Sequence, residues 1–418
     1  MYIIRGGKKL SGEVRVQGSK NSSLPILAAT ILNGKKNTIH DIPKIKDMEV
    51  MTQILSHLGA IIKKQGNTIE IDTKNVCYTK VPEQLMREMR SSIIIMGALL
   101  GRFGNVKVSY PGGCEIGPRP IDLHLKGFKA MGVSLTERHG FIYANTNELR
   151  GADIHLDFPS VGATENLMLA GVLAKGTTII RNVAKEPEIV DLQNFLNRMG
   201  VNIKGAGTDT IKIEGCKIHD LKPVSDYTII PDRIVAGTYL VAAAITKGRV
   251  VLTNVITEHL EPILAKLREM GCVLNIKNGK IELLADKPLK SLDSLRTLPY
   301  PGFPTDMQAP MMALLSTVEG TSILTETIFE NRFKHAQELR RMGADISING
   351  NTAIIKGVKK LTGAIVEAKD LRAGAALILA ALAAEGETHV EGACHVERGY
   401  ENIENNLVAL GANIVKRD

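Results

Sequence analysis

The amino-acid sequence predicts an α/β protein that repeats one helix–strand–helix–strand–strand unit six times. Two sets of glycines carry this prediction. Each glycine of the first set ends an apolar helical pattern as part of a Leu-Gly or Met-Gly pair: Gly59, Gly132, Gly200, Gly271, Gly343 and Gly411. Each glycine of the second set closes an Ala/Leu-rich helix and opens a short strand: Gly34, Gly104, Gly176, Gly248, Gly320 and Gly386. Glycine commonly caps helix C-termini, so two recurring sets indicate a repeat.

The spacing of the two sets is regular along the whole chain. Successive glycines of the first set lie 68 to 73 residues apart, and each follows a glycine of the second set by 23 to 28 residues. The second helix of a unit is amphipathic, because apolar residues such as Ile263, Leu267 and Met270 recur at helical spacing. The longest apolar run, Ala373–Ala384, is too short to span a bilayer and predicts a core helix.

The two ends of the chain indicate how the units group into lobes. The sixth unit stops after one strand, Ala412–Val415, whereas a surplus strand, Tyr2–Arg5, precedes the first helix. We expect this N-terminal strand to complete the sixth unit. Three units then form lobe 1, residues 21–229, and three form lobe 2, residues 1–20 with 230–418. Two lobes joined by paired crossings are typical of proteins that bind a ligand between the lobes and close on it.

Composition narrows the class of protein. The chain has 418 residues, 44% of them hydrophobic and 4% aromatic, as expected for a soluble α/β protein with a large core. No signal peptide is recognisable at the N-terminus, so we expect a cytoplasmic protein. The net charge of +8 comes from scattered basic residues without aromatic partners, which disfavours nucleic acid. A small anionic ligand in a basic cleft fits the charge better.

The cysteines argue against structural cross-links. Five cysteines without a CxxC pair disfavour both a disulfide framework and a zinc site, so no metal is expected. Four of them are interpreted as small buried core residues: Cys77, Cys216, Cys272 and Cys394. The fifth, Cys114, lies in a Gly/Pro-rich loop that suits a core residue badly.

Polar residues gather where the first helix of each unit begins: Lys20–Ser23, Arg90–Ser92, Ser160–Thr164, Asp232-Arg233, Thr305-Asp306 and Asp370–Arg372. Ser, Thr, Asn and Asp at these positions are ordinary helix caps. Capping does not explain the cations, which oppose the helix macrodipole and recur in four units: Lys20, Arg90, Arg233 and Arg372. Cations at helix N-termini indicate that an anion is held among them.

The loop before the second helix of each unit is the other polar position. In the second unit this loop, Pro111–Pro120, is 3 to 5 residues longer than elsewhere. Its glycines let the backbone approach a ligand, and Cys114 lies five residues before Arg119. A nearby cation favours the thiolate, so this thiol is predicted to be reactive.

These motifs, taken in order, resemble the enolpyruvyl transferases over the whole chain. The matching stretches are Gly18–Asn21, Pro111–Asp122, Pro159–Thr164, Pro301–Asp306, Phe329–Arg332, Asp370–Arg372 and His395–Tyr400. The resemblance implies a two-lobed inside-out α/β barrel of six βαβαββ-type repeats, three per lobe, with helices inside and sheets outside.

The resemblance also implies an activity. The expected reaction transfers the enolpyruvyl group of phosphoenolpyruvate to the 3-hydroxyl of UDP-N-acetylglucosamine and releases phosphate, by addition and elimination through a tetrahedral ketal. It is the first committed step of bacterial peptidoglycan synthesis. No metal or organic cofactor is implied, and the expected partners are these two small-molecule substrates, with no nucleic acid and no membrane.

Residue roles follow by the same resemblance. Cys114 is expected to protonate the methylene carbon of phosphoenolpyruvate and can also add to it covalently, and Asp306 is expected to be the base. Lys20, Arg119 and Arg398 are expected to hold the phosphoenolpyruvate anion, with Arg90, Arg332 and Arg372 as further contributors. The positions that match those holding the uridine nucleotide and its sugar are Asn21, Arg119, Pro120, Ile121, Asp122, Leu123, Ser160, Val161, Gly162, Asp306 and Ile328.

Two alternatives remain at this point. One is the sister branch that acts on shikimate 3-phosphate, which lacks a loop like that of Cys114. The other is a catalytically silent paralogue that keeps only the fold. The presence of Lys20, Cys114, Asp306 and Arg398 argues against a silent copy.

Overall fold

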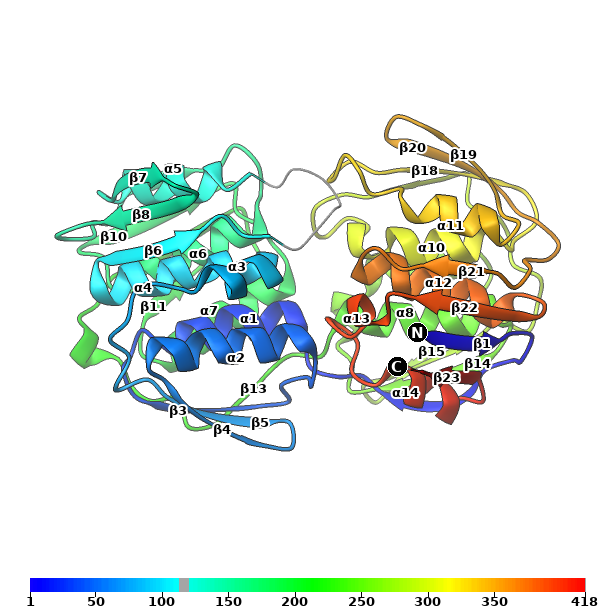
Figure 1. The fold of residues 1–418 in the computed structure, drawn as a ribbon, viewed down its shortest axis with the longest axis horizontal. Helices are drawn as coiled ribbons and strands as arrows, with labels where there is room; N and C mark the ends of the chain where they lie inside the picture. Colours follow the sequence, from blue (N-terminus) through cyan, green and yellow to red (C-terminus); the bar gives the residue numbers. More distant parts are fainter. Residues whose placement is uncertain (113–119, 418) are drawn as a thin grey trace. The chain divides into compact units, whose positions relative to one another are not determined.

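The computed structural model describes residues 1–112 and 120–417 (Figure 1). In this part of the chain six sheets form, five with four strands and one with three. Each four-stranded sheet joins a parallel strand pair to antiparallel pairs. In the three-stranded sheet, the bridge between Lys80 and Lys107 takes the place of the parallel pair. The α/β class and the sixfold repeat predicted from the glycines are confirmed.

The chain divides into two compact units, and it passes from one unit to the other between Gln17 and Gly18 and between Ile230 and Pro231. We call the described residues from Gly18 to Ile230 lobe 1, and Met1–Gln17 together with Pro231–Asp418 lobe 2. The boundaries drawn from the sequence, after residues 20 and 229, stay a prediction. Each lobe has its own hydrophobic core.

Lobe 1 contains three of the sheets. Their strands, in spatial order, are β13 (Tyr227–Thr228), β3 (Lys36–His40), β5 (Thr68–Asp72) and β4 (Ile61–Gln65); β6 (Asn105–Ser109), β8 (Phe141–Asn145) and β7 (Ser134–Arg138); and β11 (Asn202–Lys204), β12 (Thr210–Glu214), β10 (Thr177–Arg181) and β9 (Asp153–His155). Its helices are α1 (Lys20–Ala29), α2 (Lys46–Leu58), α3 (Glu83–Glu88), η1 (Arg90–Ile94), α4 (Ile95–Phe103), α5 (Asp122–Ala130), α6 (Val161–Gly171), α7 (Pro187–Arg198) and η2 (Ile218–Asp220).

Lobe 2 contains the other three sheets. Their strands, in spatial order, are β15 (Val273–Lys277), β16 (Lys280–Leu284), β14 (Arg249–Thr253) and β2 (Ser11–Arg15); β17 (Ser294–Arg296), β18 (Thr321–Thr325), β20 (Thr352–Lys356) and β19 (Asp345–Asn349); and β21 (Ile365–Glu367), β22 (Glu387–Glu391), β1 (Tyr2–Arg5) and β23 (Asn413–Lys416). Its helices are α8 (Arg233–Ile245), η3 (Thr257–His259), α9 (Glu261–Glu269), η4 (Thr305–Met307), α10 (Gln308–Leu315), α11 (His335–Arg341), α12 (Leu371–Ala383), α13 (Ala393–Val396) and α14 (Ile403–Ala409).

Helices lie inside each lobe and sheets lie outside. Every residue of α8 is buried, and α8, α10 and α12 pack against one another in lobe 2. In the strands, buried and more exposed residues alternate. In β14, Val250 and Leu252 are buried, whereas Arg249 at the start of the strand is exposed. A sheet with one buried face covers a core on that side only, which confirms the inside-out arrangement.

Within each lobe, strands that are far apart in sequence pair with one another. β1 pairs antiparallel with both β22 and β23, which confirms that the N-terminal strand completes the sixth unit (Figure 1). Two further pairings were not predicted: β2 runs parallel to β14, and β13 runs parallel to β3. β13 has only two residues, and β2 has a single buried residue among its five, so neither has the alternating apolar pattern that identifies a strand.

The glycines of the first set cap the second helices as expected. All six have φ between 87° and 110°, the left-handed region that favours glycine. At Gly59 the backbone also leaves no room for a side chain, because an added Cβ would lie 2.6 Å from the carbonyl oxygen of Asn75.

The prediction that four cysteines are buried is partly wrong. Cys272 is buried and Cys216 is half-buried, but Cys77 and Cys394 are exposed. Cys77 lies in the loop after β5, and Cys394 lies in the one-turn helix α13 at the protein surface. The buried habit of cysteine is an average over folds, and it does not decide a residue on a short surface segment. No described helix is long and apolar enough to cross a membrane.

Candidate active site

The first helices begin at the polar positions predicted from the sequence. The side chains of four N-cap residues accept backbone N–H groups of the first turn: Ser19 for α1, Ser160 for α6, Asp232 for α8 and Asp370 for α12. In Asp370, one carboxylate oxygen accepts from the backbone of Arg372 and Ala373, both at 2.9 Å. The capping interpretation is confirmed for Ser160, Asp232 and Asp370; the cap of α1 is Ser19, one residue before the predicted stretch, and the segment that begins at Arg90 has no side-chain cap.

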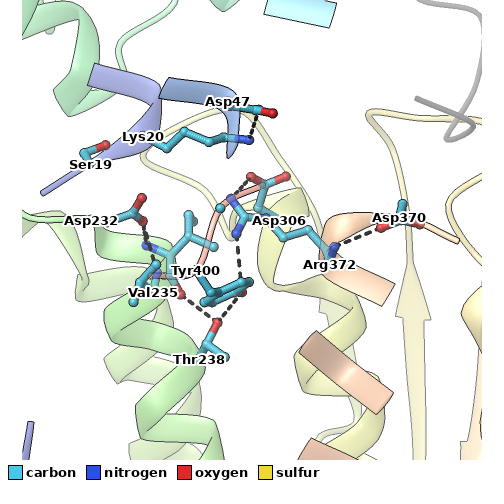
Figure 2. A network of polar contacts seen from close by, with 12 residues as sticks. Ser19, Lys20, Asp47, Asp232, Val235, Thr238, Asp306, Asp370, Arg372 and Tyr400 are labelled. Atoms are coloured by element: carbon cyan, nitrogen blue, oxygen red, sulfur yellow. Dashed lines mark hydrogen bonds and ion pairs between the residues drawn. The ribbon is translucent and has the colours of Figure 1, made fainter. Parts of the chain in front are cut away.

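Asp306 forms the centre of an ion triad in lobe 2. Its Oδ1 accepts a hydrogen bond from Nη2 of Arg332 at 2.7 Å, and its Oδ2 accepts one from Nη2 of Arg372 at 2.8 Å. Figure 2 shows the second of these contacts. The arginine side chains are only 5% and 6% exposed, and that of Asp306 is 27% exposed. Burial alone would raise the pKa of Asp306, but the two guanidinium charges outweigh it and hold the pKa well below its usual range.

This geometry corrects the expected role of Asp306 as a possible helix cap. The helical segment η4 begins after Pro304 without a side-chain cap, and α10 follows it without one. The carboxylate is instead occupied by the two arginines, which come from sequence positions far from it. A capping motif read from sequence cannot show which other side chains reach the same carboxylate.

Arg372 is held on its other side by Tyr400, whose hydroxyl is in turn bonded to Thr238. Its Nη1 donates to the Tyr400 hydroxyl at 3.3 Å, and its guanidinium lies 5.6 Å from the centre of the tyrosine ring (Figure 2). The Thr238 hydroxyl donates to the carbonyl of Ile234 at 2.8 Å, so it accepts the Tyr400 hydroxyl proton at 2.9 Å. In this series of hydrogen bonds, from Arg372 through Tyr400 and Thr238 to Ile234, each donor has one acceptor. The direction of every bond is therefore fixed.

Arg332 differs from Arg372 in having an unused donor. Its Nη1 is buried and meets no hydrogen-bond acceptor within the described residues. Its guanidinium also lies 5.2 Å from the centre of the Phe329 ring. Because a buried N–H without a partner costs about 1–3 kcal/mol, this donor favours an anionic or polar ligand nearby.

Ile328 is tied to η4 through a glutamate that sequence reasoning missed. Glu326 is 2% exposed, and its Oε1 accepts the backbone N–H of Ile328 at 2.8 Å. Its Oε2 accepts the hydroxyl of Thr305, the neighbour of Asp306, at 2.9 Å. The loop of Ile328 and the segment of Asp306 are therefore held in one network.

Arg398 lies half-buried in the turn after α13. Gln17 braces this turn, because its Nε2 donates to the carbonyl of Gly399 at 3.1 Å and its Oε1 accepts from the backbone of Glu401 at 2.8 Å. Gln17 is buried, with 8% of its surface exposed. The turn that carries Arg398 is thus fixed by the N-terminal segment of lobe 2.

Lys20 is the first residue of α1 in lobe 1 and has a carboxylate partner. Its Nζ lies 3.1 Å from Oδ2 of Asp47, in the first turn of α2, and the two side chains are 11% and 2% exposed (Figure 2). Asn21 beside it is half-buried. In the same turn, the hydroxyl of Ser22 donates to Asp191 of α7, which also accepts the hydroxyl of Tyr227 at 2.5 Å. Sequence reasoning identified Lys20 and Asn21 but not the carboxylates that hold this turn.

The two stretches predicted to contact the nucleotide meet in lobe 1. Pro120 to Leu123 lead into the first turn of α5, and Ser160 to Gly162 form the start of α6. His124, which follows the first stretch, packs its ring against Gly162 of the second, where an added Cβ would lie 3.2 Å from Cε1. Nη1 of Arg90 donates to the carbonyl of Pro111 at 3.2 Å. Cys114 and Arg119 lie outside the described residues.

Comparison with known proteins gives a consistent result. The family model of EPSP synthase (3-phosphoshikimate 1-carboxyvinyltransferase) matches residues 4–407. A relative from Caldanaerobacter subterraneus subsp. tengcongensis, "UDP-N-acetylglucosamine 1-carboxyvinyltransferase 2", is 56% identical and is covered over 99% of both chains. A relative from Symbiobacterium thermophilum, "UDP-N-acetylglucosamine 1-carboxyvinyltransferase 1", is 54% identical over 99% of this chain and 94% of its own. The crystal structure of the enolpyruvyl transferase NikO from Streptomyces tendae superposes with a TM-score of 0.90 at 26% identity, covering 99% and 98% of the two chains.

Proposed function

The chain belongs to the family of EPSP synthase and related enolpyruvyl transferases, and from this premise we propose its reaction and substrates. It transfers the enolpyruvyl group of phosphoenolpyruvate to the 3-hydroxyl of UDP-N-acetylglucosamine and releases phosphate. The observation that carries the choice of acceptor is the naming of relatives that are 50 to 56% identical over nearly the full chain as UDP-N-acetylglucosamine 1-carboxyvinyltransferases. In a bacterium this reaction serves peptidoglycan synthesis in the cytoplasm, where both substrates are found.

The addition step needs an acid and a base. The Cys114 thiol gives its proton to the methylene carbon of phosphoenolpyruvate, while the sugar hydroxyl oxygen bonds to the adjacent carbon and loses its proton to Asp306. The product is a tetrahedral ketal. In the elimination step the bond to the phosphate oxygen breaks, the Cys114 thiolate takes a proton back from the new methyl group, and the departing phosphate takes the proton held by Asp306. The enolpyruvyl ether and phosphate are left.

The two arginines beside Asp306 affect how it acts as a base. They keep the carboxylate ionised at every physiological pH, so it is always in the accepting form. They also weaken its basicity, because a low pKa reduces the driving force for proton transfer. An anion that binds the unused Nη1 of Arg332 shares the positive charge of this guanidinium, so the pKa of Asp306 rises and the carboxylate becomes a stronger base. Substrate binding and base strength are therefore coupled in this proposal.

The anionic groups of the substrates are assigned to the cations. Lys20, Arg119 and Arg398 hold the carboxylate and phosphate of phosphoenolpyruvate, and Arg90, Arg332 and Arg372 contribute further positive charge. Asn21, Pro120 to Leu123, Ser160 to Gly162 and Ile328 contact the sugar nucleotide. Asp47 supports the assignment of Lys20, because a buried ion pair fixes the position of the ammonium group at the start of α1.

A phosphate-release assay tests the proposal and its alternatives. Purified protein is mixed with phosphoenolpyruvate and either UDP-N-acetylglucosamine or shikimate 3-phosphate. We expect phosphate only with the sugar nucleotide. Release with shikimate 3-phosphate overturns the assigned acceptor in favour of the other branch named by the family model, and no release with either acceptor supports a catalytically silent copy.

A further inference from the structure

Two buried polar side chains in lobe 1, His124 of α5 and Asn166 of α6, form a hydrogen-bonded pair. His124 is 6% exposed and Asn166 is fully buried. Nδ2 of Asn166 lies 2.8 Å from Nδ1 of His124. Nothing in the reaction described above uses Asn166, so its position in the middle of a buried helix needs an explanation.

The contacts of Asn166 fix which end of its amide faces His124. Its Oδ1 accepts the backbone N–H of Gly97 at 2.7 Å, and a carbonyl oxygen is the only part of the amide that can accept this proton. Its Nδ2 donates one proton to the carbonyl of Ile93 at 3.0 Å. The second proton of Nδ2 therefore points to His124, and an amide flip would break both backbone bonds.

The protonation of the imidazole follows from this contact. Because Nδ1 of His124 meets a donor, it must accept with its lone pair, and the ring proton of the neutral imidazole lies on Nε2. Burial, and then the charge of Arg90, lower the pKa of His124 to about 4, so the ring is neutral near pH 7. His124 thus has one tautomer with one outward donor.

That donor lies beside the start of α6. A Cβ built on Gly162 would lie 3.2 Å from Cε1 and 3.5 Å from Nε2 of His124, so the imidazole edge borders this glycine. The φ of Gly162 is not positive, so the glycine is explained by space rather than by backbone conformation. Within the described part of the chain, Nε2 has no protein acceptor.

We propose that Asn166 is a positioning residue that fixes the Nε2–H tautomer of His124, and that this N–H donates to an acceptor oxygen of the sugar nucleotide beside Gly162. The proposal rests on the proposed function for the identity of the ligand. The tautomer itself does not depend on any ligand, and this separates the two parts experimentally.

The tautomer is measured by nitrogen-15 NMR of the histidine side chains at pH 7, where the two-bond couplings distinguish Nδ1–H from Nε2–H. We expect Nε2–H in the unaltered protein and Nδ1–H in Asn166→Asp, whose carboxylate can only accept. An Nδ1–H or rapidly exchanging His124 ring in the unaltered protein overturns the proposal, whatever the activity.

Binding tests the second part. Asn166→Asp and Gly162→Ala are each expected to weaken UDP-N-acetylglucosamine binding about tenfold, the value of one hydrogen bond. Gly162→Ala keeps the tautomer and covers the donor, so it serves where Asn166→Asp fails to fold. Calorimetry with UDP-N-acetylglucosamine gives this answer even without turnover, which keeps a failure of the proposed reaction separate. Unchanged affinity in a folded Asn166→Asp variant whose His124 has become Nδ1–H, or in a folded Gly162→Ala variant, overturns the donor role of His124.

Discussion

Substitution of Asp306 by asparagine gives the sharpest test of the ion triad. Asparagine keeps the size of the side chain and one acceptor oxygen, but it removes the charge that compensates Arg332 and Arg372. Its amide nitrogen would also face the N–H of one arginine, donor against donor. If Asp306 were only a helix cap, asparagine would serve almost as well as aspartate.

The expected cost follows from the burial of the two arginines. Their side chains are 5% and 6% exposed, so water cannot replace the lost carboxylate. Removing one partner of a buried pair costs about 3–5 kcal/mol, and the 27% exposure of Asp306 favours the lower end of this range. We expect a loss of about 3 kcal/mol in the free energy of unfolding and a fall in turnover of roughly 10²–10⁴-fold from the missing base.

Urea unfolding and phosphate release measure the two effects separately. Asp370→Asn is the matched control, because its oxygen can still accept from the backbone of Arg372 and Ala373, and we expect it to cost less than about 0.5 kcal/mol. In an Arg332→Gln background one cation is already gone, so Asp306→Asn is expected to cost about 1–2 kcal/mol less there. An Asp306→Asn protein as stable as the unaltered protein would refute the ion triad, and a near-normal rate would show that Asp306 is not the base.

Three further predictions concern single residues. Tyr400→Phe keeps the ring beside Arg372 but removes its acceptor, so we expect it to cost about 1 kcal/mol in urea unfolding and to lower kcat more than KM. Burial lowers the pKa of His335 to about 4, below its ordinary value of 6.5, so the unfolded chain binds more protons between these values and stability falls as pH drops through this window. Between pH 7 and pH 4 we expect His335→Gln to remove about 3 kcal/mol of this fall, and an equal pH slope in both proteins would contradict it. Fosfomycin, an epoxide phosphonate, is expected to alkylate Cys114 before any other cysteine in mass spectrometry, and Cys114→Asp to keep more activity than Cys114→Ser; adducts spread over the exposed cysteines would sink the thiol's assigned role.

Features set by neighbours in sequence could be predicted, because the physical cause is local. The glycines at helix ends and the caps Ser160, Asp232 and Asp370 each depend on the backbone within three or four residues. The repeat spacing predicted six units, and the structure has one sheet for each of them in its described residues. Strand β1 could be assigned because the repeat arithmetic left one strand missing and one in surplus.

Features set by distant partners could not be predicted in this way. Asp47 and Tyr400 reach their cations from 27 and 28 residues away, and no local pattern distinguishes them from surface residues of the same type. The same holds for β2, whose parallel partner β14 begins more than two hundred residues later. Asn166 has no polar periodicity around it, because its purpose is evident only when three separate partners are placed around it.

The ion pairs change the interpretation of the cations at helix N-termini. From the sequence, the recurrence of Lys20 and Arg372 indicated an anion supplied by a ligand. The structure shows that each already has a carboxylate of the protein, Asp47 or Asp306. Arg372 also donates to Tyr400, so both of its terminal nitrogens are engaged, whereas Nη1 of Arg332 meets no acceptor among the described residues. An arginine whose second nitrogen is buried without an acceptor gains most from an incoming anion. We therefore infer that, of these two arginines, Arg332 is the stronger hydrogen-bond donor to a bound anion. The role of the helix-start cation Arg372 is to hold Asp306 in place.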